Sequence, residues 1–181
     1  YVDVEAIPEY SPGAVTQTLA QSRESEIVDY VAVAAVKWPA LRTAFKAFKA
    51  AAAPERRIDF EKFRAERGAL LSRFACFEAL RHRLKSPWWE WPPEWREPDE
   101  AACTRLRAGE DVDEIEFVEF GQWNADRQLA ACKARADELG MKVGLYLDVA
   151  VGVQSDGFDA WNEQGAISRL LGVGAPPDPL A

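Results

Sequence analysis

The chain has 181 residues, a formal net charge of −8 at pH 7, and 48% hydrophobic and 29% charged residues, which is ordinary for a globular protein. This length is sufficient for one domain with a hydrophobic core. The acidic balance argues against nucleic acid as a partner, because phosphate binding requires a basic surface. The longest apolar run, around Val143 to Val153, is interrupted by Asp148 and is shorter than the ~20 residues of a membrane-spanning helix, so we expect no membrane segment.

The start of the chain predicts a strand, a loop and a long helix. Residues 1–8, YVDVEAIP, alternate apolar and polar side chains, which is typical of a strand. Residues 11–24 are rich in serine, threonine and glutamine and predict a loop. Residues 24–53 place apolar side chains at helical spacing, with Asp29 in the first turn and an expected kink or split at Pro39.

The middle of the chain predicts two more helices, separated by an irregular loop. Residues 58–85 keep an apolar period close to 3.6. The side chains that follow this period are Phe60, Phe63, Leu70, Phe74, Phe77 and Leu80. Residues 86–98, SPWWEWPPEWREP, contain four prolines and four tryptophans, and the prolines exclude a regular helix or a central strand. Residues 99–109 predict a short helix that ends near Gly109.

The last third of the chain predicts a helix followed by a strand. Residues 113–140 form the expected helix, which Gly140 ends in a left-handed C-cap. Within it, Gln122 and Trp123 are expected to pack against a sheet. Residues 141–153 are almost continuously apolar, which predicts a buried parallel strand. The expected fold class is therefore α/β, with a helical block over about residues 12–113.

The cysteine and histidine content predicts neither a disulfide framework nor a zinc site. Cys76, Cys103 and Cys132 are odd in number and far apart, which is typical of a reducing compartment. His82 is the one histidine, and its basic, solvated surroundings place it at the surface. The chain begins with Tyr1 and carries no signal-peptide pattern, and both ends look interrupted, so we expect a segment of a larger protein.

Three segments near the C-terminus are candidate sites, each with a structural alternative. Asp148 ends the expected parallel strand, where α/β folds place their sites, although it could instead cap N–H groups at a turn. Residues 155–161, SDGFDAW, contain the Asp156-Gly157 turn signal, and capping of a short helix by aspartate or serine is the favoured interpretation. Residues 174–178, GAPPD, form either a stiff binding loop or a simple connection.

The tryptophans of residues 86–98 also have two interpretations. The flat faces of Trp88, Trp89, Trp91 and Trp95 suit stacking on the apolar faces of sugar rings. Such a cluster is more often a satellite core under a loop. We favour the core interpretation.

Five strings occur in the order YVDVEAIPE, VDYVAVAAVKWPAL, FVEFGQWNADRQL, GMKVGLYLDVAVGVQSDGFDAW and GVGAPPD. Together they resemble segments of the 4-alpha-glucanotransferases, also called amylomaltases or disproportionating enzymes, of glycoside hydrolase family 77. The last two strings are the most specific. The resemblance implies a partial (β/α)8 TIM barrel with a mainly helical inserted subdomain. Residues 1–11 would be a barrel strand and exit loop, 12–113 the helical insertion, and 114–181 a barrel helix–strand unit with cleft loops.

The resemblance also implies a reaction. It is the transfer of α-1,4-glucan segments between malto-oligosaccharides with retention, by one nucleophilic and one acid/base carboxylate. The implied partners are α-1,4-glucans, without nucleic acid or membrane, and no metal or organic cofactor is implied. The implied location is cytoplasmic.

Site residues follow from the same resemblance. It implies substrate-binding roles for Asp148, Pro176, Pro177 and Asp178 and supporting roles for Asp159 and Trp161. Leu147 stands where long-form relatives often carry arginine. The R.DH motif of the nucleophile and the later acid/base do not occur in these 181 residues and are expected beyond Ala181, so we expect the isolated chain to be inactive. The alternative is a non-catalytic remnant that binds glucan through its tryptophans or serves a structural role.

Overall fold

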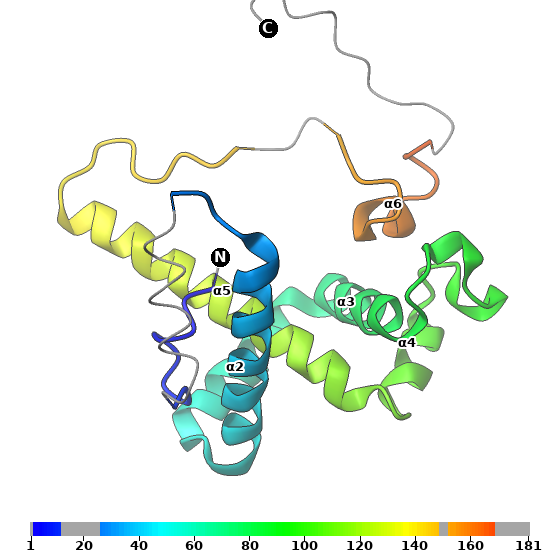
Figure 1. The fold of residues 1–181 in the computed structure, drawn as a ribbon, viewed down its shortest axis with the longest axis horizontal. Helices are drawn as coiled ribbons and strands as arrows, with labels where there is room; N and C mark the ends of the chain where they lie inside the picture. Colours follow the sequence, from blue (N-terminus) through cyan, green and yellow to red (C-terminus); the bar gives the residue numbers. More distant parts are fainter. Residues whose placement is uncertain (1, 12–25, 149–151, 169–181) are drawn as a thin grey trace, which may run out of the picture. The chain divides into compact units, whose positions relative to one another are not determined.

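The computed structural model describes residues 2–11, 26–148 and 152–168 (Figure 1). This part of the chain is helical and contains no strand and no sheet. Its α-helices are α2 (Tyr30–Ala51), α3 (Pro54–Leu84), α4 (Glu100–Arg107), α5 (Val112–Glu138) and α6 (Phe158–Asn162). Two short 3₁₀ helices, η1 (Trp88–Glu90) and η2 (Pro93–Trp95), lie between α3 and α4. The expected partial TIM barrel of an α/β fold is therefore wrong for the described residues.

The expected strand after α5 is not formed. A strand needs hydrogen bonds from a neighbouring strand, and the described part of the chain supplies none. Residues 141–148 instead leave Val143 82% and Tyr146 89% exposed. Gly144 has φ +72°, which departs from the extended conformation. Val143 and Tyr146 are therefore exposed rather than buried in a sheet.

The expected N-terminal strand is a pair of turns. The N–H of Ile7 donates to the carbonyl oxygen of Val4 at 3.3 Å, and the N–H of Tyr10 donates to that of Ile7 at 2.9 Å. Val4 is 3% and Ile7 2% exposed, so the buried side chains are three residues apart rather than two. Side chains at that spacing share a face of a turn, not a face of a strand.

The described chain divides into two compact units. The first comprises Tyr1–Glu66 and Phe117–Gly144, and the second comprises Arg67–Glu116 and Leu145–Ala181. Helix α3 contributes to both, and its backbone is non-helical at Gly68, with φ 54° and ψ −138°. The break explains why Leu70, expected on the buried stripe, is 57% exposed, since the helical phase is not continuous across it.

An aromatic cluster from α2, α3 and α5 forms the core of the first unit. Phe48 lies at its centre, with ring centroids 5.1 Å from Phe120, 5.4 Å from Phe60 and 5.5 Å from Trp123. The sequence had suggested that Trp123 packs against a sheet. In the structure it packs against other helices instead. Tilted and edge-on contacts at these distances are favourable for aromatic rings.

Helix ends in the first unit follow local sequence signals. Helix α2 begins after Asp29, whose carboxylate accepts hydrogen bonds from the N–H groups of Val31 and Ala32 at 3.0 and 2.9 Å. Asp29 is thus the N-cap and not a first-turn residue. The helix continues through Pro39 without a split. At the end of α5, Gly140 has φ +70°, as predicted for a left-handed C-cap.

Candidate functional site

The second unit holds the segment SDGFDAW, which leads into α6. The N–H of Gly157 donates to the carbonyl oxygen of Gln154 at 2.9 Å, closing a turn. A Cβ at Gly157 would lie 3.1 Å from that same oxygen, so the turn favours glycine. Gly157 is also the N-cap of α6 and makes no side-chain capping bond. The prediction of a turn is confirmed, and the prediction of an aspartate or serine cap is wrong.

Two indole groups fasten this segment to residues 86–98, hereafter the tryptophan loop. The indole Nε1–H of Trp161 donates to the carbonyl oxygen of Trp95 at 3.0 Å. The indole Nε1–H of Trp88 donates in the other direction, to the carbonyl oxygen of Ser155 at 3.0 Å. The side chain of Gln164 adds a bond to the carbonyl oxygen of Arg96 at 2.7 Å. Side chains thus satisfy two carbonyl groups of the tryptophan loop and one of the SDGFDAW segment.

The aromatic rings of the tryptophan loop and α6 pack on the C-terminal part of α3. The ring of Phe77 lies 5.3 Å from Trp91 and 5.4 Å from Trp161, centroid to centroid. Trp88, Trp91 and Trp161 are only 6%, 1% and 1% exposed. Their faces are therefore not available for stacking on a sugar. The satellite-core interpretation is correct for Trp88 and Trp91, whereas Trp89 and Trp95 are half-buried.

The residues proposed from the sequence to bind or support substrate differ in their surroundings. Asp159 and Trp161 both lie on α6, where Asp159 is exposed and Trp161 is buried. Asp148 is exposed, in the segment between α5 and α6. Pro176, Pro177 and Asp178 lie outside the described residues. For Trp161, the structure gives a hydrogen bond to the Trp95 carbonyl oxygen and ring contacts with Phe77 and Trp91.

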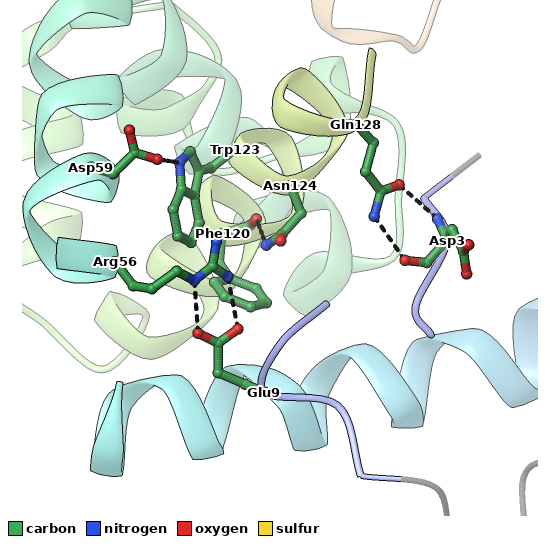
Figure 2. A network of polar contacts seen from close by, with 8 residues as sticks. All are labelled: Asp3, Glu9, Arg56, Asp59, Phe120, Trp123, Asn124 and Gln128. Atoms are coloured by element: carbon green, nitrogen blue, oxygen red, sulfur yellow. Dashed lines mark hydrogen bonds and ion pairs between the residues drawn. The ribbon is translucent and has the colours of Figure 1, made fainter. Parts of the chain in front are cut away.

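A polar network in the first unit joins the N-terminal segment to α5 (Figure 2). The N–H of Asp3 donates to Oε1 of Gln128, and Nε2 of Gln128 donates to the carbonyl oxygen of Asp3, both at 2.8 Å. Further along, Nε and Nη2 of Arg56 donate to the two carboxylate oxygens of Glu9 at 2.9 and 2.7 Å. Such two-pronged charged pairs fix orientation as well as contributing energy.

Trp123 lies at the centre of this network. Its indole Nε1–H donates to Oδ2 of Asp59 at 2.9 Å, and Nη1 of Arg127 donates to Oδ1 of the same carboxylate at 2.8 Å. The guanidinium of Arg56 lies 4.1 Å from the centroid of the Trp123 ring, a cation–π contact. Figure 2 shows Asp59 at the indole nitrogen and Arg56 beside the ring.

Sequence reasoning missed this network. The available signal was the spacing of Arg56 and Asp59, three apart on one helix, which places both side chains on the same face. Their partners in the N-terminal segment and α5 are far away in sequence. Only the packing of α3 against those segments brings the charges to Trp123.

The described residues hold neither a metal cluster nor a membrane-spanning helix. Among residues 2–11, 26–148 and 152–168, no group of three or more histidine, cysteine, aspartate or glutamate side chains is arranged to hold a metal ion. None of the helices described is both long and apolar enough to span a bilayer. His82 is surface-exposed, as expected, with its Nδ1 4.0 Å from Oε1 of Glu114.

Comparison with known proteins identifies the family. A family model described as 4-alpha-glucanotransferase, glycoside hydrolase family 77, matches residues 1–181. The chain belongs to the 4-alpha-glucanotransferase family. This confirms the resemblance drawn from the five strings.

Individual 4-alpha-glucanotransferases match over most of this chain. The protein of that name from Mycobacterium tuberculosis H37Rv is 31% identical over 186 residues, covering 98% of this chain and 25% of the relative. The one from Thermus thermophilus is 35% identical over 160 residues, covering 83% of this chain and 31% of the relative. The one from Haemophilus influenzae is 28% identical over 202 residues, covering 99% and 29%. The chain thus spans between a quarter and a third of the length of these relatives.

Three of the strings that resemble 4-alpha-glucanotransferases supply residues to the polar network of the first unit and to the contacts of the tryptophan loop. Asp3 and Glu9 belong to YVDVEAIPE, and Trp123 and Gln128 belong to FVEFGQWNADRQL. The string that ends in SDGFDAW supplies Trp161 to the tryptophan loop. Each of these strings therefore contributes residues that make contacts within the structure.

Proposed function

We propose that this chain is part of an enzyme that transfers α-1,4-glucan segments between malto-oligosaccharides, with retention at the anomeric carbon. The observation that carries the proposal is the match of the 4-alpha-glucanotransferase family model to all 181 residues. Retention would require two carboxylates, a nucleophile and an acid/base, acting through a glycosyl-enzyme intermediate. The R.DH motif associated with the nucleophile is not found in these 181 residues. We therefore propose that the 181-residue chain by itself does not catalyse transfer.

The role we propose for this chain is to bind the glucan and to support the binding residues. Asp148 would accept hydrogen bonds from sugar hydroxyl groups, and Pro176, Pro177 and Asp178 would line the same glucan cleft. The exposure of the Asp148 side chain to solvent supports a role in binding. A charged acceptor suits sugar hydroxyls, because a bond to an ionised group is stronger than a bond between neutral groups.

Asp159 and Trp161 would support that cleft. The buried ring of Trp161 and its bond to the Trp95 carbonyl favour a positioning role over contact with substrate. Cys76, Cys103 and Cys132 form no disulfide, which supports a cytoplasmic, reducing location for the enzyme. No cofactor enters this proposal.

The test compares two substitutions in the product of the complete reading frame, which contains at least these 181 residues. Asp148→Asn keeps the size of the side chain and removes its charge. Glu97→Gln does the same to another exposed carboxylate of the second unit and is the matched control. The assay follows glucose release and longer maltodextrins formed from maltotriose.

We expect Asp148→Asn to lower kcat/KM by about 10- to 100-fold, which corresponds to the loss of a charged hydrogen bond, and Glu97→Gln to leave it unchanged. Equal activity of both variants would remove Asp148 from the site. No transfer by the unsubstituted protein would overturn the proposed reaction itself. Glucose release by the isolated 181-residue chain would contradict its proposed inactivity.

Burial of the tryptophans weighs against the alternative of a glucan-binding remnant. This alternative would require exposed ring faces at Trp88 and Trp91, but both rings are buried in the core. Retention of the 181-residue chain on an amylose column, lost on Trp89→Ala at the half-buried position, would restore the alternative. We expect no retention.

A further inference from the structure

Two cysteines from different helices meet in the core of the second unit. Cys76 on α3 is 0% exposed, and Cys103 on α4 is 6% exposed. The Sγ of Cys76 lies 3.8 Å from the carbonyl oxygen of Cys103, as a hydrogen-bond donor. The side chain of Cys103 also interacts with that of Cys76, which is the first of the causes that shift its pKa. The Cys76 side chain is therefore in contact with Cys103, although 27 positions separate the residues in sequence.

The helices can approach closely at this point because their buried neighbours are small. Ala75 and Ala79 flank Cys76 on α3 and are 0% and 1% exposed. Ala102 precedes Cys103 on α4 and is 2% exposed. Alanine side chains let two helix backbones come nearer than larger residues would. A disulfide requires such proximity, because its Cα atoms must lie within about 7 Å.

The surroundings of Cys103 favour its thiolate. The hydrogen bond from Cys76 is the main cause that lowers the pKa of the Cys103 thiol below its ordinary value of 9.0. The positive charges of Arg107 and Arg73 lower the pKa further, while burial and Asp99 oppose them. The thiolate is the nucleophilic form of cysteine, so this shift favours reaction at the Cys103 sulfur.

We propose that Cys76 and Cys103 are a peroxide-sensitive pair that closes to a reversible disulfide between α3 and α4. The oxidant is hydrogen peroxide, which is small enough for a sulfur atom with so little exposed surface. Bulkier oxidants, such as a glutathione disulfide, would not reach it in the folded protein.

The chemistry has two balanced steps. In the first, the Cys103 thiolate attacks one oxygen of the peroxide. A sulfur–oxygen bond forms, the oxygen–oxygen bond breaks, and the released hydroxide takes a proton to become water. In the second, the Cys76 sulfur attacks the sulfenic sulfur of Cys103, a sulfur–sulfur bond forms, and the sulfur–oxygen bond breaks. The thiol proton leaves with that oxygen as a second water, so one peroxide accepts the two electrons of one disulfide.

The crosslink would enclose the tryptophan loop, since residues 86–98 lie between the two cysteines. That loop supplies the carbonyl group that holds Trp161. Closing a loop of this size restricts the unfolded chain and stabilises the folded one. We expect the oxidised protein to melt about 5–10 °C higher than the reduced protein.

The test uses the purified protein with Cys132→Ser, which removes the exposed thiol and its intermolecular disulfides. The protein is treated with hydrogen peroxide and then denatured in the presence of a thiol-alkylating reagent, which blocks the free thiols. It is then digested and analysed by mass spectrometry. The expected result is a linked pair of peptides carrying Cys76 and Cys103, two hydrogen atoms lighter than their sum. Dithiothreitol should return both thiols. Two alkylated cysteines, or sulfinic acid without linked peptides, would overturn the proposal.

Single substitutions separate the roles of the two thiols. With Cys76→Ser or Cys76→Ala, the sulfenic acid on Cys103 has no resolving thiol, and dimedone should trap it after native peroxide treatment. With Cys103→Ser, dimedone should label nothing at Cys76. Labelling of Cys76 instead of Cys103 would overturn the assignment of the nucleophile. Circular dichroism shows which of the two Cys76 variants retains the helical fold. The dimedone result is taken from that variant.

Discussion

The indole N–H of Trp161 donates a hydrogen bond to the main-chain carbonyl oxygen of Trp95 at 3.0 Å. The donor is on α6 and is buried, while the acceptor is in the tryptophan loop. This bond is one of those that join the SDGFDAW segment to a loop more than sixty positions earlier in sequence. It explains why tryptophan is suited to this position better than another large apolar residue.

Replacing Trp161 by phenylalanine should destabilise the protein by about 1–3 kcal/mol, because a poorly solvated carbonyl loses its partner and a smaller ring leaves space. Trp95→Phe is the matched control. It makes the same change of an indole to a phenyl ring, but it leaves the bond between the Trp161 indole and the main-chain carbonyl of residue 95 in place. The free energy of unfolding in urea measures both. A Trp95→Phe variant as unstable as Trp161→Phe would show that ring volume, and not the hydrogen bond, decides the effect.

Asp59 is expected to be important for the first unit because its carboxylate is the acceptor for the buried Trp123. Asp59→Ala should cost about 1–3 kcal/mol, since the indole N–H is left unpaired. Asp59→Asn should recover much of that loss, because its amide oxygen still accepts one bond. Asp137→Ala is the control. It breaks an exposed pair with Lys133 on α5, at 2.7 Å, and should cost less than about 0.5 kcal/mol. Equal losses for Asp59→Ala and Asp137→Ala in urea unfolding would contradict this account.

Two glycines should respond to alanine with opposite signs. Gly140 has φ +70° and nothing lies within 4 Å of an added Cβ, so Gly140→Ala carries backbone strain alone and should cost about 1–2 kcal/mol. Gly121 lies inside α5, and its added Cβ would be 3.8 Å from Cδ2 of Leu41, an ordinary contact. Gly121→Ala should therefore stabilise the protein by about 0.5–1 kcal/mol through helix propensity. Thermal unfolding of both variants tests the pair, and a shared sign would contradict it.

Cys103 should give stability a specific dependence on pH. Its pKa is lower in the folded protein than its ordinary value, so folding favours the thiolate. The stabilising contribution is therefore present above the unfolded pKa and is lost as pH falls through the folded pKa. The groups that set it are Cys76, Arg107 and Arg73, with Asp99 acting in the opposite direction.

The measurement is the difference in unfolding free energy between the Cys132→Ser protein and the same protein with Cys103→Ser. It is made under reducing conditions between about pH 7 and pH 10. The advantage of the cysteine should grow toward alkaline pH, and Arg107→Gln should reduce that growth. A difference that is constant with pH would contradict the inferred shift.

The sequence predicted most of the helices because their signals are local. The apolar period and Gly140 anticipated α5 to within a few residues, and residues 99–109 anticipated α4. Errors occurred where a local signal allowed two outcomes. Asp29 satisfies either a first-turn or an N-cap position, and the structure uses the cap. Pro39 is accommodated within one continuous helix.

For the candidate site, the sequence identified segments but not their contacts. Trp161 was chosen through family resemblance, and its buried environment and its acceptor came from the structure. The Asp59–Trp123 pair was not anticipated, because neither residue carries a local mark of the other. The contact between Cys76 and Cys103 was missed for the same reason. The odd number and wide spacing of the cysteines had predicted only that there is no disulfide framework.

Local sequence signals were enough for the helix periods, the C-cap at Gly140 and the family, because each depends on neighbouring residues or on strings read in order. What residues 2–8 and 141–148 form depended on long-range contacts instead. Their apolar patterns suit strands, yet a strand is defined by hydrogen bonds to a partner, and the described chain provides none. The same holds for Trp161, Trp123 and the two buried cysteines. Their roles depend on groups far away in sequence, which only folding brings within bonding distance.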